Sequence, residues 1–480
     1  MIDKEYYAYI SIGFVLICHK TFLVGFWTDG NSICKWNSGR IEKMDMKCSH
    51  ILIMIIIVFI CACQNSKVSE LYYLPDGKPL YEIGPLNNCP IILVHGFGGF
   101  GRDELFGYKY WGGFTDIQEE LKNRGYPVYS AAIGPFSSNW DRACELYSYI
   151  KGGYVDYGKA HSKKFQHRRF SRYYKGIYPQ WGEINPITGK RNKIHLVAHS
   201  QGGQTSRALI TLLEQGASEE KQHTASYDLS LLFKGGNHWV HSLTTLSTPH
   251  DGMTVNYMMN RVLPFGQRLV RFGSLLSRQV DGFIYDFKMD QWEIERKENE
   301  TFWEYAKRLR SQSLWLRTKD TSDFDLSPEG AEILNEWAKA QKDVYYFSFA
   351  TEETFKSPFS DHHYPEFTMD LVWLPSAIFM GTFSRNEPDR IPIDSSWFQN
   401  DGVVNSISMD GPTLGSTDVI EDFDGTPKKG QWNYMGMLES CDHADIIGAL
   451  RYFGENCPDG YPSLVDFYVY WAEFLSHLPE

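Results

Sequence analysis

Ala198-His199-Ser200-Gln201-Gly202-Gly203 is the stretch that decides how this 480-residue chain folds. The apolar run at residues 194–197 directly before it predicts a buried strand, and apolar residues at helical spacing after it predict a helix. A strand, a sharp turn and a helix together form a nucleophile elbow, which lifts a serine hydroxyl above a sheet and leaves room only for small neighbours. The pattern here is Ala-x-Ser-x-Gly, with Ala198 where glycine is usual. It makes Ser200 the candidate nucleophile.

A glycine-bearing loop follows the preceding apolar run. Residues 90–94 predict another buried strand, and the loop His95-Gly96-Phe97-Gly98-Gly99 follows it. In acyl-transfer enzymes with an elbow, one backbone N–H after the nucleophile and one from such a loop form the oxyanion hole. We therefore expect the N–H groups of Phe97 and Gln201 to take this role. Taken alone, His95-Gly96 is equally compatible with a plain turn.

A serine hydroxyl needs a base, and the base needs a carboxylate to orient it. Behind an elbow these residues follow in the order serine, acid, histidine, which makes Asp401 and His443 the candidates. The alternatives are a plain turn at Asp401-Gly402 and a surface loop at His443. Rival bases are His199, His250, His362 and His363, although the side chain of His199 is expected to point away from the hydroxyl.

This order of motifs predicts an α/β-hydrolase fold, an α/β class with a mostly parallel central sheet flanked by helices. Residues 243–247 and 344–349 predict further parallel strands, and residues 328–342 and 463–475 predict helices. The chain is 42% hydrophobic and carries a formal net charge of −12. It can therefore bury a large core, and it has no net basic character for binding nucleic acid.

Several long blocks of sequence resemble the thermoalkalophilic bacterial lipases, a family that includes the large secreted staphylococcal lipases. The resemblance begins near residue 88 and extends to the C-terminus. It implies a triacylglycerol lipase or carboxylesterase that hydrolyses acylglycerol esters at an oil–water interface, with Ser200, Asp401 and His443 as its triad. The blocks are residues 106–113, 137–144, 198–204, 248–252, 286–292 and 400–406.

The resemblance also implies a structural zinc site in an insertion beside the fold. The matching ligands are Asp141, His161, His167 and Asp320. Two imidazoles and two carboxylates can complete a tetrahedral shell around Zn²⁺. Without the resemblance, the basic stretch at residues 159–172 would be interpreted as a solvated loop. A nearby acidic group, Asp286, Asp290 and Glu293, is expected to form ion pairs with Lys288 or Arg296.

The calcium site of this family is expected to be lost or rebuilt. The resemblance places one ligand acid at Asp445, but Leu450 and Arg451 replace an expected Asp-Pro pair. Leucine offers no side-chain oxygen, and a guanidinium repels a cation. A disulfide between Cys441 and Cys457 is a hypothetical substitute that would hold the loop carrying His443.

The domain organisation follows from these assignments. We expect an N-terminal extension with a signal-like segment at residues 1–66 and a lipase domain at residues 67–480. Residues 139–182 and 286–325 are expected to contribute to the zinc-bearing insertion. Residues 256–282 alternate apolar and polar positions at helical spacing, which is more typical of a core helix by periodicity alone, but their place in the family predicts an amphipathic lid that contacts lipid.

The apolar run at residues 51–60 has a basic residue before it and small residues after it. This pattern predicts a secretory signal, because the run is too short for a membrane span. The sequence around Cys63 also loosely resembles a lipoprotein anchor. Two other functional classes stay open: a phospholipase or transacylase with the same catalytic residues, and an inert lipid-binding relative.

Overall fold

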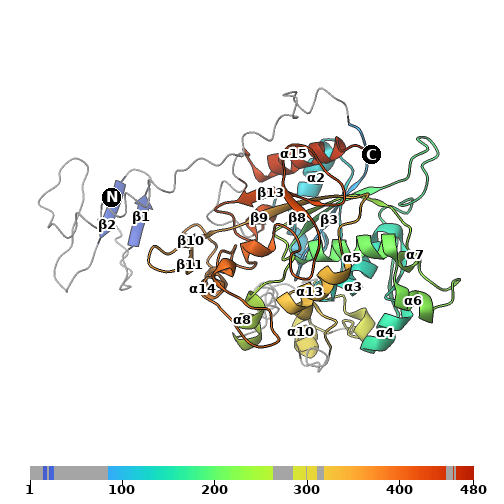
Figure 1. Cartoon of the computed structure of the whole chain (residues 1–480), viewed down its shortest axis with the longest axis horizontal. Helices are drawn as coiled ribbons and strands as arrows, with labels where there is room; N and C mark the ends of the chain where they lie inside the picture. Colours follow the sequence, from blue (N-terminus) through green and yellow to red (C-terminus); the bar gives the residue numbers. More distant parts are fainter. Residues whose placement is uncertain are drawn as a thin grey trace, which may run out of the picture. The chain divides into compact units, whose positions relative to one another are not determined.

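Within the described residues of the computed structural model, seven parallel strands form one sheet in the order β12-β13-β9-β8-β7-β3-β4 (Figure 1). The strands run over β3 (Ile91–Val94), β4 (Val128–Ser130), β7 (Ile194–His199), β8 (Val240–Leu246), β9 (Tyr345–Thr351), β12 (Ile420–Asp422) and β13 (Trp432–Leu438). β7, which leads to the candidate nucleophile, is hydrogen-bonded between β3 and β8.

The structure describes residues 14–18, 21–25, 85–262, 285–298, 300–310, 318–449, 458 and 461–480. The chain divides into two units, Met1–Lys67 and Val68–Glu480. In the first unit, β1 (Phe14–Cys18) pairs antiparallel with β2 (Thr21–Gly25). In the second, two small antiparallel pairs accompany the large sheet: β5 (Gly153–Asp156) with β6 (Phe170–Tyr174), and β10 (Thr354–Lys356) with β11 (His363–Pro365).

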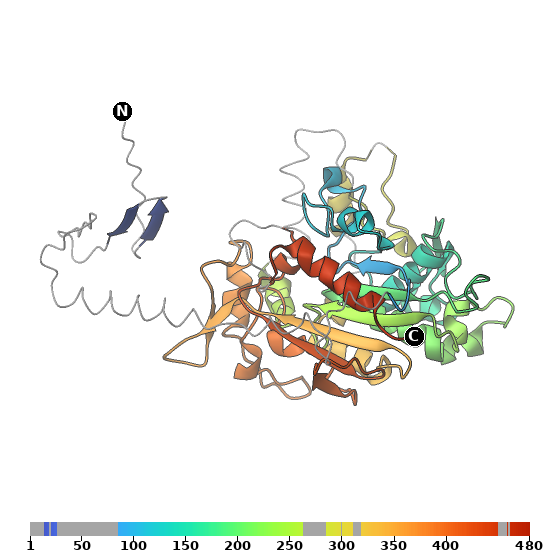
Figure 2. The ribbon, with the colours of Figure 1, turned by 90° about the horizontal axis from the view of Figure 1, so that it is seen from above.

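Helices cover both faces of the large sheet, because its strands are apolar on both faces. On β3, for example, Ile92 and Val94 join one core cluster while Ile91 and Leu93 join the other. The first cluster contains side chains of α3, α5, α7 and α13, and the second contains those of α2 and α15 (Figure 1). Seen from above in Figure 2, α15 lies over the sheet.

The helices of the second unit have the following bounds: α2 (Ile117–Asn123), α3 (Asn139–Lys151), α4 (Lys159–Phe165), α5 (Gln201–Gln215), α6 (Ser218–His223), α7 (Leu231–Lys234), α8 (Val255–Val262), α10 (Phe302–Arg310), α12 (Ser322–Asp325), α13 (Pro328–Trp337), α14 (Leu374–Met380) and α15 (Leu464–Ser476). Short 3₁₀ helices include η4 (Asp290–Trp292) and η7 (Asp445–Ile447).

The predicted mostly parallel sheet with flanking helices is confirmed. The helix expected at residues 328–342 begins as predicted, with Ser327 as its N-cap, but α13 ends at Trp337. After Trp337, polar side chains form hydrogen bonds with the backbone. Arg207 donates to the carbonyl of Ala338, and the Asp418 carboxylate accepts from the N–H of Ala340. These contacts replace the hydrogen bonds that would continue the helix.

Several expectations fall on residues that the structure does not describe. Only the first residues of the predicted lid at 256–282 belong to α8, and the rest lie outside the described residues, as do Leu450, Arg451 and the signal-like run at 51–60. The predicted domain boundaries and the limits of the insertion stay predictions. None of the helices that the structure describes is both long and apolar enough to cross a membrane.

Candidate functional site

Ser200 lies in a strained turn between β7 and α5. Its φ is 55° and its ψ is −131°, a conformation that costs free energy for any residue except glycine. Space around the turn is tight. A Cβ at Gly202 would lie 2.4 Å from the Val94 carbonyl oxygen, and one at Gly96 would lie 2.6 Å from the Ser200 Cβ. The small residues of the motif are therefore required by close backbone packing.

Asp401 and His443 lie together on loops at the same sheet edge. The Nδ1–H of His443 donates to Asp401 Oδ2 at 2.7 Å, and the His443 backbone N–H donates to the Asp401 carbonyl at 3.0 Å. Thr351 Oγ1 donates to the same carboxylate oxygen at 2.8 Å, and the N–H of Val404 donates to Oδ1 at 2.7 Å. Because Nδ1 carries the proton, Nε2 keeps the lone pair that a general base needs.

Ser200 and His443 come from distant parts of the chain but lie in one neighbourhood. The ring of His199, next to the serine, lies 4.5 Å from the ring of His443 between centroids. Ser200 is 5% exposed and His443 is 7% exposed, so the imidazole does not face bulk solvent. Among the described residues, no hydrogen bond joins Ser200 Oγ to His443. Such bonds often tighten only when substrate is bound.

Two of the rival histidines, His199 and His250, make polar contacts away from the Ser200 hydroxyl. His199 contacts Tyr110 Oη through Nδ1 at 2.6 Å and the His443 carbonyl through Nε2 at 2.9 Å. His250 contacts Thr245 at 3.1 Å, and burial together with the Arg207 charge lowers its pKa well below the usual range. His362 and His363 are the other two rivals. Burial is the main cause that lowers the pKa of His363, and the ring of His362 packs edge-to-face against Phe398.

The two candidate oxyanion-hole residues sit in fixed segments. Gln201 is the first residue of α5, so its N–H has no acceptor within the helix. Its side chain donates to the Ser137 carbonyl at 3.2 Å and accepts from Ser322 Oγ at 2.9 Å. On both sides of Phe97 the backbone is hydrogen-bonded: the N–H of Gly96 donates to Tyr110 Oη, and the N–H of Gly98 donates to Pro135.

Arg142 binds the backbone of the loop at residues 95–99, the candidate oxyanion loop, a contact that the sequence did not predict. Its guanidinium is fully buried and donates to the carbonyls of His95 and Gly134, each at 2.5 Å, and to Thr205 Oγ1 at 2.8 Å. Burial lowers its pKa to about 10, so it keeps its charge at neutral pH. Arg142 and Tyr110 both fall in the blocks that resemble the lipases. Their place in these blocks is the sequence signal that could have identified both residues.

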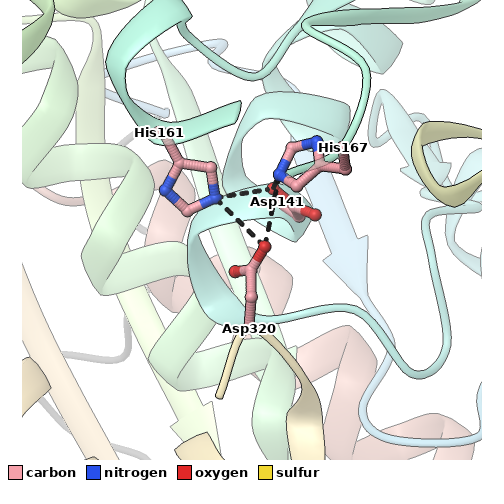
Figure 3. A group of neighbouring side chains, drawn as sticks. All are labelled: Asp141, His161, His167 and Asp320. Atoms are coloured by element: carbon pink, nitrogen blue, oxygen red, sulfur yellow. Dashed lines mark ion pairs between the residues drawn. The ribbon is translucent and has the colours of Figure 1, made fainter. Parts of the chain in front are cut away.

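A second group of side chains converges on one point, as Figure 3 shows. We call Asp141, His161, His167 and Asp320 the mixed cluster. Asp141 is on α3, His161 is on α4, His167 follows α4, and Asp320 precedes α12. The imidazole Nε2 atoms lie 3.2 to 3.9 Å from the carboxylate oxygens. Ligands about 2.0 Å from a tetrahedral zinc ion lie about 3.3 Å apart, so the spacing fits this ion.

The protonation of the mixed cluster also fits a metal. Within the described residues, its four facing atoms, one from each side chain, are buried without a hydrogen-bond partner. His167 Nδ1 donates to the Arg168 carbonyl at 2.8 Å, so Nε2 is the nitrogen that can bind a metal when the ring is neutral. Although burial opposes it, the carboxylates of Asp141 and Asp320 raise the pKa of His161 to about 9. A metal ion would therefore have to displace protons here.

A third group lies beside the candidate base. We call Glu353, Asp442 and Asp445 the carboxylate cluster, whose facing oxygens lie within 4.8 Å of one another. All three residues are buried, and neither oxygen of Glu353 has a hydrogen-bond partner among the described residues. Burial, followed by nearby negative charges such as Asp445, raises the pKa of Glu353 to about 8. The pKa of Asp442 is raised for the same reasons.

The cysteines differ in state. Cys441 is disulfide-bonded, whereas Cys89 and the buried Cys144 are free. Cys457 lies outside the described residues, so its pairing with Cys441 stays a prediction.

Comparison of the sequence with known proteins finds one family match and several similar lipases. The family described as "Lipase-like, C-terminal domain" matches residues 87–472. Lipase 1 of Staphylococcus aureus (strain MRSA252) is 35% identical over 373 residues, which cover 75% of this chain and 51% of the relative. The lipase of Staphylococcus epidermidis is 35% identical over 390 residues, which cover 80% and 53%. The chain thus spans about half the length of these relatives.

Solved structures match over most of both chains. EstA from Clostridium botulinum is 43% identical with a TM-score of 0.75, covering 89% of this chain and 98% of that one. Lipase 1 from Pelosinus fermentans is 46% identical with a TM-score of 0.73, covering 82% and 100%. Staphylococcus hyicus lipase is 32% identical with a TM-score of 0.66, covering 82% and 96%.

Proposed function

The chain belongs to the lipase-like C-terminal domain family, and on this premise we propose that it is a serine ester hydrolase acting on acylglycerol esters. The observation that carries the proposal is the 2.7 Å hydrogen bond between His443 and Asp401, on a sheet whose elbow presents Ser200. Several of its relatives are named lipases, which supports the same substrate class.

The proposed reaction is acyl transfer in two halves. His443 Nε2 takes the proton of Ser200 as the hydroxyl oxygen attacks the ester carbonyl, and Asp401 stabilises the imidazolium that forms. The N–H groups of Phe97 and Gln201 hold the oxyanion. The histidine then gives its proton to the leaving alcohol. It next takes a proton from water, which attacks the acyl-enzyme and releases the fatty acid.

The test is labelling by a fluorophosphonate, which reacts only with an activated serine. We expect rapid labelling of the wild type, no labelling of Ser200→Ala and strongly slowed labelling of His443→Asn. Ser206→Ala, on the same helix, is the matched control and should label like the wild type. An unlabelled wild-type protein would leave the inert lipid-binding alternative. Among active alternatives, turnover of phosphatidylcholine in preference to triolein would favour a phospholipase, and ester transfer to added alcohols would favour a transacylase.

We further propose that the mixed cluster binds zinc as a structural ion. The support is that three of the four nitrogen–oxygen distances, 3.2 to 3.3 Å, match tetrahedral ligand spacing, the fourth being 3.9 Å, and that the four facing atoms have no hydrogen-bond partner among the described residues. With four protein ligands no position stays open for substrate, so the ion would hold α3, α4 and the chain before α12 together rather than act in the reaction.

For calcium, a rebuilt site is better supported than the loss of the family's site. The carboxylate cluster offers the hard oxygen ligands that calcium prefers, and a bound cation would offset the repulsion that contributes to the raised pKa values of Glu353 and Asp442. Glu353, Asp442 and Asp445 would be its side-chain ligands. Because Asp442 and Asp445 flank His443, the ion would hold the loop that carries the base.

The lid at 256–282 and secretion remain proposals from the sequence. The described start of the lid region is anchored, because Tyr257 Oη donates to Glu329 at 2.8 Å and its ring stacks on Phe383. If the lid covers the site, activity should rise sharply once substrate exceeds its solubility. Smooth saturation through that point would contradict it.

A further inference from the structure

The hydroxyl of Tyr110 lies between two parts of the candidate active site. It accepts a hydrogen bond from the N–H of Gly96 at 3.0 Å, and it lies 2.6 Å from His199 Nδ1. His199 Nε2 in turn lies 2.9 Å from the backbone carbonyl oxygen of His443. An unbroken chain of contacts therefore joins the oxyanion loop to the backbone of the candidate base.

The directions of these hydrogen bonds follow from the partners. A carbonyl oxygen only accepts, so His199 Nε2 carries a proton and donates to His443. Burial, together with the neighbouring His443, lowers the pKa of His199 well below its usual range, so the ring is neutral and Nδ1 is an acceptor. Tyr110 already accepts from Gly96, and its single proton therefore goes to Nδ1. Every donor in the chain has one defined acceptor.

This series of hydrogen bonds completes the contacts that fix His443 in position. The residue is fixed at its N–H by the Asp401 carbonyl, at Nδ1 by the Asp401 carboxylate, and at its carbonyl by His199. On the other side, Gly96 immediately precedes Phe97. We propose that Tyr110 and His199 are positioning residues that fix the base and the oxyanion loop relative to each other. The inference rests on the proposed function, and among the described residues neither side chain has a hydrogen bond to Ser200 Oγ or to the ring of His443.

Removal of one hydroxyl at Tyr110 and two amide substitutions at His199 can separate a positioning role from a packing role. Tyr110→Phe keeps the ring beside Phe100 and Trp111 and removes only the hydroxyl. At position 199, glutamine can reach the His443 carbonyl with an N–H, as Nε2 does, whereas asparagine matches the acceptor Nδ1 and is too short to reach that carbonyl. The two amides differ by one methylene group, so a packing role predicts that activity falls only as far as Tm does, whereas the positioning role predicts a loss of activity in His199→Asn beyond the change in Tm.

The experiment measures the fluorophosphonate labelling rate of Ser200, kcat and KM on p-nitrophenyl butyrate, and Tm. We expect Tyr110→Phe to lower the labelling rate and kcat roughly tenfold with little change in KM, since small misplacements of reacting groups are costly. His199→Gln should retain more activity than His199→Asn. The double variant Tyr110→Phe/His199→Gln should lose less than the product of the single losses, because both changes break one chain.

The matched control is Tyr149→Phe, which removes a tyrosine hydroxyl bonded to the Ser130 carbonyl at 3.1 Å, away from the site. Labelling of Tyr110→Phe within twofold of this control overturns the inference, and so do equal losses in the two His199 variants. If Tyr110→Phe does not fold, the His199 pair still decides. A wild-type protein that is not labelled at all would instead overturn the proposed function.

Discussion

The mixed cluster and the carboxylate cluster are both buried groups of potential ligands, but they differ in how they balance charge without a cation. In the mixed cluster, protonated imidazoles can form ion pairs with Asp141 and Asp320, and the pKa of Asp320 is lowered despite burial because His161 and His167 face it. In the carboxylate cluster, burial and neighbouring carboxylates raise the pKa values of Glu353 and Asp442. The difference indicates a nitrogen-preferring metal at the first and a hard cation at the second.

The clusters also differ in what they hold. The mixed cluster joins α3, α4 and the chain before α12, away from the reacting atoms, so it should act on stability. The carboxylate cluster joins the end of β9 to the loop that carries His443, so it should act on activity as well.

The largest expected effect is the removal of zinc. A ligand at about 1,000 times its Kd stabilises the folded state by about 4 kcal/mol, which at about 2 °C per kcal/mol is roughly 8 °C in Tm. We therefore expect a zinc-selective chelator to lower Tm by about this amount, and His161→Ala to abolish the response. Calorimetry with and without the chelator measures both.

The carboxylate cluster provides the control for this experiment. Glu353→Gln should leave the zinc response intact, because its side chain belongs to the other group. A chelator that shifts neither protein would remove the zinc assignment.

The two clusters also show what a sequence can and cannot predict. The elbow was predictable because its strand, turn and helix are contiguous, and the strands around it were confirmed. The acid and the base were candidates from the chain order behind an elbow, and the resemblance supported them, whereas the mixed cluster came from resemblance alone because its members are far apart along the chain. Asp401 and His443 were brought together by the fold, whereas Glu353 was missed, since nothing in residues 351–354 indicates a partner at position 442.

Ion-pair partners were the weakest prediction. Lys288 or Arg296 was expected to neutralise the acidic group at residues 286–293, but Arg172 on β6 pairs with Asp286 and Asp290, and Lys288 pairs with Glu104. The prediction was wrong because it considered only neighbours in sequence. Tertiary packing brings these charges together across more than 100 residues.

The next effect in size is the addition of calcium. At about 100 times its Kd a ligand contributes about 2.7 kcal/mol, or roughly 5 °C in Tm, and we also expect kcat to rise because the loop of His443 is held. Asp442→Asn should lose both responses while keeping its response to zinc. Magnesium serves as the ionic-strength control. A rise in Tm without a change in kcat would separate this cluster from the base.

A smaller effect is expected from pH in metal-free protein. The pKa of Glu353 is raised to about 8, so the folded state binds a proton that the unfolded chain releases near pH 4.5. Stability from this group is therefore lost as pH rises from about 4.5 to about 8. The difference in Tm between Glu353→Gln and the wild type should grow with pH across this window.

The mixed cluster gives the matching comparison at higher pH. The pKa of His161 is raised to about 9, so its contribution is present below about pH 6.5 and is lost as pH rises towards 9. The difference between His161→Ala and the wild type should therefore change above pH 6.5 and stay flat below it. Identical profiles for the Glu353 and His161 variants would contradict the distinction between the clusters.

The smallest effect tests how the mixed cluster is oriented. Gln291 is fully buried, and its Nε2 donates to Asp141 Oδ2 at 2.9 Å and to Ser137 Oγ at 3.1 Å. It therefore holds one carboxylate oxygen and directs the other towards the histidines. Groups that orient a metal ligand typically contribute about 10- to 100-fold in affinity, so Gln291→Ala should weaken zinc binding by at least about tenfold in a competition titration. Gln215→Ala, which removes an exposed amide of α5 that donates to Gln341 Oε1 at 3.1 Å, should bind zinc like the wild type. Equal zinc affinity in both variants would mean that the four side chains are held by their own backbones alone.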